Sequence, residues 1–505
     1  MFNFIKKIVT TKRIRNKVNL RGKKVVVMGI GLHGGGVSMI KWLVQQGAKV
    51  VATDKKTKET LATSIKKLSK LVKNKKVKLI IGRHRLDDFR SADMIIKNPA
   101  VPWTNTYIKK ARKNDIDVEM DSSLFFKLCP SKKIIGITGT KGKTTTSYIL
   151  NAILKKAGKK VVMVGAGKIT VMDRLKLIGK NTYVIFELSS WRLSALRKHK
   201  ISPKYAVVTN IYPDHLNYYK TMRGYINDKL AIVKYQKKNS LAVLNYDNKE
   251  TRKFSRETKA EVAYFSIKDS NSIIQDVYLE DEKIKYRTDK KDGVICAVDE
   301  LKILGRHNIS NIMAGATMAL RLKISPKIIR KAVIGFKGIK HRLEFISKKG
   351  EILFYNDSAA TTPESAVAGI NAFIEGSQSS EIYLIAGGSS KELDLKVFAD
   401  KITYTEEVKK VVLLKGLASD TLLKLLEKNG GKEKVIKTVS TMKEAVDSMN
   451  IAIKKDKVDQ NNPKNMEIIT NKIVLLSPGC ASFGLFDNEF DRGNQFREIV
   501  VTLKG

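Results

Sequence analysis

The amino-acid sequence predicts an α/β protein of three domains with mostly parallel sheets. Short apolar runs of strand length alternate with segments that repeat apolar residues at helical spacing, which is typical of parallel α/β sheets. Glycine-rich turns follow apolar runs at residues 29–36 and 139–142, where a strand would pass into a helix. The length of 505 residues suggests about three domains at about 150 residues each. We expect domains 1–130, 131–337 and 338–505.

The first segment begins with "KKVVVMGIGLHGGGVSMIKWLVQQGAKVVATD". Residues 25–28 are predicted to form a buried strand, followed by a glycine-rich turn, a helix and a second strand that ends at Asp54. Gly29, Gly31 and Gly34 fit the pattern G-x-G-x-x-G, and Asp54 stands where an acid that binds ribose is expected. The pattern indicates a nucleotide-binding half-fold. Alternatively, the glycines only let the helix pack closely on the sheet.

The second segment opens with "IIGITGTKGKTTTSYIL", residues 134–150. The usual phosphate loop, G-x-x-x-x-G-K-[ST], needs a glycine where Ile137 stands, so the spacing is unusual. The chemistry still suits phosphate, because backbone N–H groups at a helix N-terminus bind anions. Lys143 would supply a positive charge to the terminal phosphates, and Thr144 would offer a hydroxyl to Mg²⁺.

Two further predicted strands of this segment end in polar residues. The run 183–186 is followed by Glu187, and the run 205–209 is followed by Asn210 and then by Asp214 and His215. Because the carboxyl ends of parallel strands share one edge of a sheet, these groups should gather near the loop. Glu187 and His215 could bind a second cation, although Mg²⁺ prefers oxygen to imidazole. Alternatively, Glu187 caps a helix and His215 is an ordinary surface histidine.

The remainder of the chain repeats the alternation. Residues 261–304 are predicted to form several short strands, and a third segment starts near residue 338. There, runs such as "IYLIAGGSSKELD" and "KIVLLSPGCASFGLFDNEF" again alternate with helical patterns, which predicts another parallel α/β sheet.

Composition narrows the class of protein. The formal net charge of +47 comes from 96 lysines and arginines against 49 acidic residues, and it favours acidic partners such as nucleotides, nucleic acid or an anionic membrane. The lysines are spread along the whole chain, so a generally lysine-rich surface explains the charge equally well. Three distant cysteines predict no disulfide framework or zinc site, and no apolar run reaches the roughly 18 residues that span a membrane. We expect a cytoplasmic protein with a basic, solvated leader.

Taken together, the motifs resemble the Mur ligase family, the ATP-dependent enzymes that add amino acids to the UDP-linked peptidoglycan precursor. The blocks that carry the resemblance lie in order along nearly the whole chain: "GITGTKGKTTT", "ELSSW", "NIYPDHLNYY", "GRHNISN", "KHRLE", "YNDSAATTPES" and "LSPGCASFGLFDNEFDRGNQF". The first block explains the unusual loop spacing, because the family has its own phosphate loop. The last two blocks, with "GIGLHGGG", are most similar to members that add D-glutamate to UDP-N-acetylmuramoyl-L-alanine.

The resemblance implies a Rossmann-like N-terminal domain that binds the UDP end, a central P-loop-type ATPase domain, and a Rossmann-like C-terminal domain that binds the amino acid. The residues it assigns to ATP are Gly139, Thr140, Lys141, Gly142, Lys143, Thr144, Thr145, Asn308, Asn311, Arg342 and Asp357. The residues it assigns to the other substrates are Leu32, His33, Asp54, Asn98, Ser189, Lys391, Ser482 and Phe486. Within the ATP set, Asn308 and Asn311 would approach adenine, Arg342 a phosphate, and Asp357 the ribose.

The resemblance also implies ATP and Mg²⁺ as cofactors and a two-step reaction. The substrate carboxylate attacks the γ-phosphorus to form an acyl phosphate, and the amine of D-glutamate then displaces phosphate. Lys143, His215 and Lys229 would be catalytic, and the metal ligands would be Thr144, Glu187, His215 and Lys229. Lys229 falls where the family has a carbamylated lysine; from the sequence alone it would be a solvated lysine on a helix. A carbamate is anionic, and its oxygens suit Mg²⁺ where an ammonium would be repelled.

The sequence departs from the family pattern at two positions. The members specific for D-glutamate commonly have a lysine where Ala359 stands, and they tend to have a Gly-Asn pair where Gly165-Ala166-Gly167 stands. These changes put one charge and one substrate hydrogen bond in doubt, but they leave the ATP residues intact.

Three alternatives remain at the level of sequence. One is a Mur-type ligase for another amino acid, and another is a degenerate ligase retained as a binding protein. The third is a basic NTPase that acts with nucleic acid. The low aromatic content, 7%, and the absence of a basic stripe interleaved with aromatics weigh against the third. We therefore expect a monomeric enzyme of small-molecule substrates that requires no nucleic acid.

Overall fold

The computed structural model describes residues 18–503, apart from 33, 168, 215, 269–275, 289–290, 375–379, 391 and 461–470. The chain divides into two compact units, one made of Met1–Val298 with Ser310–Ile334 and the other of Asp299–Ile309 with Gly335–Gly505. His33, His215, Lys391 and the basic leader, residues 1–17, fall outside the described residues. The domain boundaries at residues 130 and 337 stay a prediction.

The first sheet has the strand order β3-β2-β1-β4-β5, with every pair parallel. Its strands are β1 (Lys24–Met28), β2 (Lys49–Asp54), β3 (Val77–Ile81), β4 (Met94–Lys97) and β5 (Asp117–Glu119). The helices between and after them are α2 (Gly35–Gln45), α3 (Ala62–Lys73), α4 (Leu86–Arg90), α5 (Thr106–Lys113) and α6 (Asp121–Leu128).

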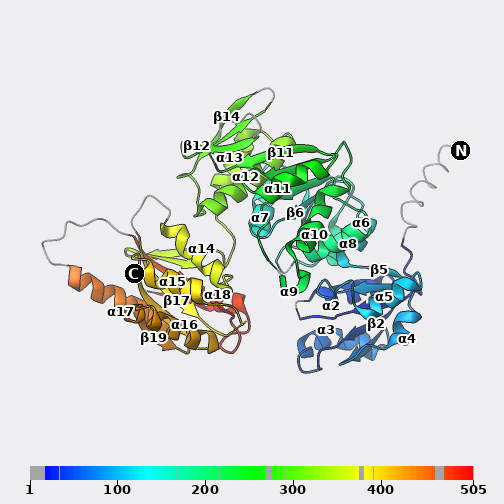
Figure 1. The fold of residues 1–505 in the computed structure, drawn as a ribbon, viewed down its shortest axis with the longest axis horizontal. Helices are drawn as coiled ribbons and strands as arrows, with labels where there is room; N and C mark the ends of the chain where they lie inside the picture. Colours follow the sequence, from blue (N-terminus) through cyan, green and yellow to red (C-terminus); the bar gives the residue numbers. More distant parts are fainter. Residues whose placement is uncertain are drawn as a thin grey trace. The chain divides into compact units, whose positions relative to one another are not determined.

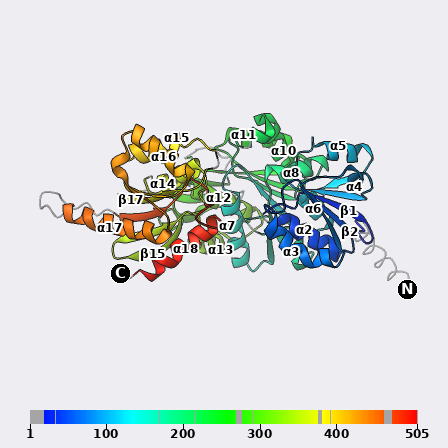
Figure 2. The same ribbon diagram turned by 90° about the horizontal axis from the view of Figure 1, so that it is seen from below.

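Both faces of this sheet are covered, which explains why β1 is apolar at each position after Lys24. In β1, Val25 and Val27 pack with residues of α2 and α3, while Val26 and Met28 pack with residues of α4 and α5. Figure 2 shows the strands between these two layers of helices. The first segment is therefore a Rossmann-like half-fold with a glycine-rich turn between β1 and α2.

The second sheet has the order β14-β13-β12-β11-β10-β9-β6-β8-β7. Its strands are β6 (Ile134–Thr138), β7 (Val161–Val164), β8 (Tyr183–Glu187), β9 (Tyr205–Val208), β10 (Leu241–Asn245), β11 (Glu261–Ser266), β12 (Val277–Glu280), β13 (Lys283–Arg287) and β14 (Asp292–Ala297). The pairs from β7 to β12 are parallel, and β13 pairs antiparallel with β12 and with β14. The strand β6 lies between β8 and β9, so its loop lies between the ends of the two strands that carry Glu187 and Asn210.

The helices of this segment lie along the sheet and around it (Figure 1). They are α7 (Lys143–Lys156), η1 (Met172–Leu177), α8 (Ser190–Lys198), α9 (Leu216–Tyr219), α10 (Met222–Lys234), α11 (Lys249–Lys253), η2 (Phe254–Glu257), α12 (Arg306–Arg321) and α13 (Pro326–Ile334). A single core of buried residues joins β8, β9 and β10 to α8 and α10 and continues to α2 in the first segment.

The second unit has a sheet of order β15-β16-β20-β17-β18-β19, in which only the β15–β16 pair of the described strands is antiparallel. Its strands are β15 (Glu344–Lys349), β16 (Ile352–Asn356), β17 (Ser380–Gly387), β18 (Val408–Leu414), β19 (Val435–Val439) and β20 (Asn471–Leu476). Its helices are α14 (Pro363–Ile374), α15 (Lys396–Tyr404), α16 (Leu417–Lys428), η3 (Lys432–Lys434), α17 (Met442–Gln460) and α18 (Glu489–Thr502). The helices α14 to α16 share one core with β17 and β18, and α17 and α18 share another with the opposite face.

The predicted fold class is confirmed: the chain is α/β with mostly parallel sheets. A search of the described helices finds none that is both long enough and apolar enough to cross a membrane.

Candidate active site

The loop between β6 and α7 depends on two glycines. Gly139 has a φ of 157°, and a Cβ there would overlap the hydroxyl of Thr209. Gly142 caps α7 in the left-handed region with a φ of 84°, and a Cβ there would overlap the side chain of Asn311. Any other residue at either position would push the loop away from the strand ends. The glycines therefore hold the loop close to the edge of the sheet, with its N–H groups leading into the helix N-terminus.

Two side chains that directly follow β9 hold the loop at Lys141. Asn210 Oδ1 accepts a hydrogen bond from Lys141 N at 2.9 Å, and Thr209 Oγ1 donates to Lys141 O at 2.6 Å. Thr140 is buried, and its hydroxyl lies 3.0 Å from that of Tyr225 on α10. The sequence placed Asn210 at a strand end without giving it a role, and it missed Thr209. The only sequence signal for either was their place directly after β9.

The Lys143 side chain folds over this loop. Its Nζ donates to Gly139 O and to Thr140 O, both at 2.9 Å. The ammonium is therefore held at the loop carbonyls, beside the N-terminus of α7, where phosphate oxygens are expected.

Thr144 and Glu187 meet at the same edge of the sheet. Thr144 Oγ1 donates to Glu187 Oε2 at 2.8 Å, because β6 and β8 are neighbours and Ile137 pairs in register with Glu187. Two of the expected metal ligands are thus in contact across 43 residues of sequence. Both offer oxygen, the atom that Mg²⁺ prefers.

Lys229 is buried, which corrects the expectation from its local sequence. The side chain is 1% exposed, and its Nζ donates to Gly139 O at 2.7 Å and lies 4.8 Å from the centre of the Tyr225 ring. Burial lowers the pKa of its amine far below the ordinary value; the charge of Lys143 lowers it further, while Asp214 and Glu187 act in the opposite direction. Lys229 therefore lies at the centre of the candidate site with an amine whose pKa is lowered by burial.

The described residues supply part of the expected magnesium site. Among them, no three side chains of His, Cys, Asp and Glu lie together in a way that could hold a metal ion. Thr144 and Glu187 supply oxygens, and the carbamate that the family resemblance implies at Lys229 would bring two more. His215, the fourth expected ligand, lies outside the described residues. Such an oxygen-rich set suits a hard cation.

Two other expected contacts of this segment have structural roles. Ser189 is the N-cap of α8, and its side chain accepts a hydrogen bond from Arg192 N at 3.3 Å. Asn311 is 5% exposed and accepts a hydrogen bond from Thr146 Oγ1 at 3.3 Å, so it braces the start of α7. Thr145, on the first turn of α7, is half-buried. Their contacts with substrates stay predictions.

In the first segment, Asp54 supports the glycine-rich turn. Its Oδ2 accepts hydrogen bonds from the N–H groups of Ile30, at 2.9 Å, and Gly31, at 3.2 Å. Asn98 packs against Gly29 and donates to its carbonyl at 3.3 Å. Leu32, at the tip of the turn, is 46% exposed and open to a ligand. Asp54 and Asn98 thus shape the turn, and any contact they make with the UDP end stays a prediction.

In the second unit, Asp357 is a buried carboxyl at the end of β16. It accepts hydrogen bonds from Ser477 Oγ at 2.8 Å and from Leu343 N at 3.2 Å. Burial raises its pKa to about 7, although these hydrogen bonds and the charges of Arg342 and Arg492 act to lower it. Arg342 is exposed near this carboxyl, and Asn308 donates to Leu304 O at 2.7 Å.

Because its pKa is raised, Asp357 should make stability depend on pH. The folded protein holds this proton more tightly than the unfolded chain, so the stability contributed by the neutral carboxyl is lost as pH rises from about 4 to about 7. The upper limit is roughly 4 kcal/mol, from about three pH units at about 1.4 kcal/mol each. Calorimetry of the wild type and Asp357→Asn at pH 5 and pH 8 should show that the wild type loses more stability between the two. Parallel loss in both proteins would contradict this.

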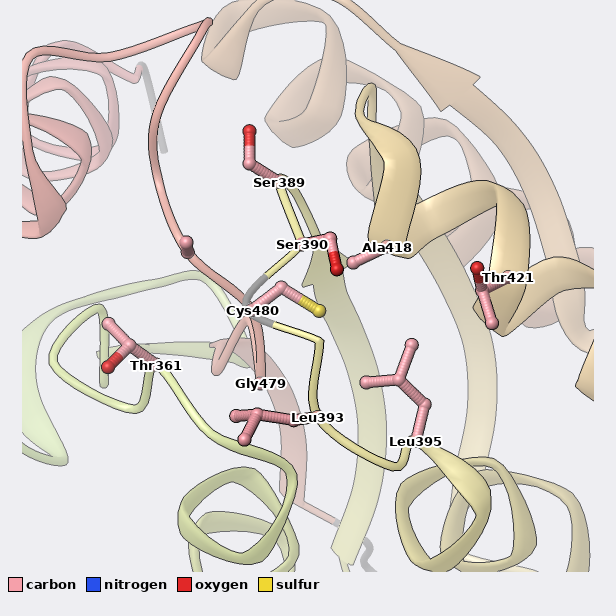
Figure 3. Close-up of a pocket in the computed structure, with 10 residues that line it drawn as sticks. Thr361, Ser389, Ser390, Leu393, Leu395, Ala418, Thr421, Gly479 and Cys480 are labelled. Carbon is pink, nitrogen blue, oxygen red and sulfur yellow. The ribbon is translucent and has the colours of Figure 1, made fainter. Parts of the chain in front are cut away.

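The second unit also contains a small polar pocket where the ends of β17 and β20 face the start of α16 (Figure 3). It has about 310 Å³ of empty space, counting its open mouth. The residues that line it are Thr361, Ser389, Ser390, Leu393, Leu395, Ala418, Thr421, Gly479, Cys480 and Ala481. In Figure 3 the side chains of Ser390 and Cys480 point into the space beside Ala418. Ser482 directly follows the lining residues and is buried, while Phe486 is part of the core on the α17 and α18 side.

Comparison with known proteins identifies the family. The MurD-like N-terminal domain of Mur ligases matches residues 23–119, the Mur ligase middle domain matches 137–319, and the glutamate ligase domain of Mur ligases matches 341–458. The UDP-N-acetylmuramoylalanine–D-glutamate ligase of Roseiflexus sp. (strain RS-1) is 36% identical over 494 residues, which cover 96% of this chain and 100% of that protein. The chain belongs to the Mur ligase family. The family predicted from the motifs is confirmed, and with it the assignment as a ligase.

Solved Mur ligases share the fold at lower identity. The UDP-N-acetylmuramate-alanine ligase of Thermotoga maritima superposes with a TM-score of 0.56 at 19% identity, covering 95% of this Mur ligase and 99% of that chain. The MurF ligase of Thermotoga maritima, solved in complex with ADP, has a TM-score of 0.54 at 16% identity, with 95% and 96% covered.

Proposed function

We propose that this Mur ligase uses ATP and Mg²⁺ to join D-glutamate to UDP-N-acetylmuramoyl-L-alanine in peptidoglycan precursor synthesis, acting as a cytoplasmic monomer. The observation that carries the proposal is the convergence on Gly139, whose carbonyl accepts hydrogen bonds from both Lys143 and Lys229. Thr144 and Glu187 are in contact with each other beside this loop. The similarity to the Roseiflexus ligase over nearly all of both chains supports D-glutamate as the amino acid.

The residues of the loop serve the first step. A carboxylate that attacks the γ-phosphorus of ATP brings two anions together, and the N–H groups of the loop with Lys143 would offset this repulsion. Lys143 needs only to turn from the Gly139 and Thr140 carbonyls toward the phosphates. Thr144, Glu187, His215 and carbamylated Lys229 would hold Mg²⁺, which would supply positive charge beside the phosphates. Attack forms the acyl phosphate, and ADP leaves.

The second step requires the unprotonated amine of D-glutamate. We assign the removal of this proton to His215, and attack of the free amine on the acyl carbonyl then expels phosphate. We assign D-glutamate to the second unit, with Lys391, Ser482 and Phe486 as its contacts, and we take the small pocket next to Ser482 as part of this subsite. Ala359 and Ala166 are the two positions at which this chain departs from the family pattern. The N–H of Ala359 donates to His341 O at 2.9 Å, and Ala166 is buried.

A substrate panel tests the proposal. The protein would be incubated with UDP-N-acetylmuramoyl-L-alanine, ATP, Mg²⁺ and single amino acids, and phosphate release would be measured along with the mass of the product. We expect release with D-glutamate at a rate at least about tenfold above that with L-alanine, L-glutamate or a diamino acid. Preference for another amino acid would leave the assignment to the Mur ligase family intact and would show that D-glutamate is not the substrate. Phosphate release that depends on DNA would instead favour an NTPase that acts with nucleic acid.

A further inference from the structure

The pocket of the second unit is built from three chain segments that are joined by hydrogen bonds. Residues 357–361 follow β16, residues 388–390 follow β17, and residues 477–482 follow β20. The second and third are joined by a two-way bridge, in which Ser389 N donates to Ala481 O at 2.9 Å and Ala481 N donates to Ser389 O at 3.1 Å. The first is tied to the third by Gly479 N, which donates to Ala360 O at 2.9 Å, by Ser477 Oγ, which donates to Asp357 Oδ2 at 2.8 Å, and by one further buried side chain.

That side chain is Arg492, in the first turn of α18. It is 0% exposed. Its Nε and Nη2 donate to Ser358 Oγ and Ser358 O, both at 3.0 Å. Its Nη1 and Nη2 also donate to Cys480 O, at 3.2 and 3.3 Å. One planar guanidinium therefore spans the segment that carries Thr361 and the segment that carries Cys480 and Ser482.

Arginine is the side chain that can do this. Burying a cation costs free energy unless its N–H groups are matched by acceptors, and here they are matched by carbonyl and hydroxyl oxygens. Burial lowers the pKa of Arg492 to about 10, so it keeps its charge at neutral pH. A lysine side chain has a single nitrogen and cannot donate hydrogen bonds to the same acceptors on both segments with this geometry. The start of α18 is itself fixed, because Asn488 caps it and Glu489 O accepts from Ser358 Oγ at 2.6 Å.

We propose that Arg492 is a positioning residue for the amino-acid substrate. It sets the spacing between the two segments on either side of the pocket without touching the ligand. Ala359, directly after Ser358, offers no side chain that could take over this work. The inference rests on the proposed function, because it takes this pocket as the amino-acid subsite.

A positioning role and a merely structural one predict different kinetics. If Arg492 sets the pocket, its loss raises the KM for the amino acid and leaves the KM for UDP-N-acetylmuramoyl-L-alanine unchanged. If it only stabilises the fold, the melting temperature falls and every kinetic constant of the remaining folded enzyme stays the same.

The test compares Arg492→Lys with Arg497→Lys in the full-length enzyme. Arg497 lies on the same helix and pairs with Glu344 instead of the pocket segments. For Arg492→Lys we expect the KM for D-glutamate to rise at least about tenfold and the KM for the UDP substrate to stay within about twofold. For Arg497→Lys both should stay within about twofold. A folded Arg492→Lys enzyme with an unchanged D-glutamate KM, or with all KM values raised equally, would overturn the inference.

Two further measurements keep the test decisive. If Arg492→Lys does not fold, Ser358→Ala removes one acceptor and keeps the arginine, and an unchanged amino-acid KM in that variant would overturn the inference. If the wild type does not turn over D-glutamate at all, the proposed substrate is wrong, and the same variants are measured with the amino acid that the panel shows to be accepted.

Discussion

Lys143→Ala should abolish measurable turnover, which we take as a fall of at least about a thousandfold in kcat. The ammonium lies at the phosphate loop, held by the carbonyls of Gly139 and Thr140, and it would be the side-chain cation that meets the terminal phosphates. Without it, the negative charge that builds up as the carboxylate attacks the γ-phosphorus would lack its strongest partner. The fold should survive, because the side chain is not part of the buried core.

The matched control for this variant is Lys156→Ala. Lys156 is an exposed lysine in the last turn of the same helix, so its replacement removes the same charge far from the loop. Phosphate release and product mass would be measured for both variants, with circular dichroism to confirm folding. Retained ligase activity in Lys143→Ala would remove this residue from the proposed mechanism. Equal loss in both variants would point to helix stability instead of phosphate binding.

The sequence predicted the fold well because hydrophobic periodicity decides it. Strands covered by helices on both faces are buried at every position and mostly apolar, as β6 is, and such runs stand out between helical patterns. The convergence of Lys143, Thr144 and Glu187 was also predictable, since neighbouring parallel strands end at one edge of a sheet. The register between β6 and β8 places Glu187 opposite Ile137. The carboxylate of Glu187 therefore lies next to the Thr144 hydroxyl.

The sequence could not predict burial of single charged residues. Lys229 lies in "INDKLAIVK", where the local sequence alone does not separate it from the exposed Lys234 five residues later. Only the packing of α10 against the loop puts one lysine in the core and leaves the other in solvent. Arg492 is similar: it stands among charged residues in "NEFDRGNQF", yet it is fully enclosed. The sequence singled out Asp54 as an acid for a ligand, and the structure shows that its Oδ2 accepts hydrogen bonds from the glycine-rich turn; its contact with a substrate stays a prediction.

Lys229→Ala should lower kcat by at least about a hundredfold, and short carboxylates should restore part of the loss. Burial lowers the pKa of the Lys229 amine, which favours the unprotonated form that reacts with CO₂, and the resulting carbamate would place an anionic oxygen pair near Thr144 and Glu187. Alanine leaves a space at this position that acetate or propionate could enter to supply the same oxygens. A primary alkylamine of similar size would supply only the unmodified group.

The outcome therefore separates the two chemical states of Lys229. Rescue by carboxylates and not by amines is expected if the carbamate is the working form, whereas rescue by amines alone would show that the unmodified lysine is. Lys234→Ala, an exposed change on the same helix, is the control and should keep wild-type kcat. The wild type should also lose activity in buffer depleted of CO₂ and regain it on addition of bicarbonate, which Lys229→Ala cannot do. This response follows from the burial of Lys229, because only an amine without its proton can take up CO₂ near neutral pH.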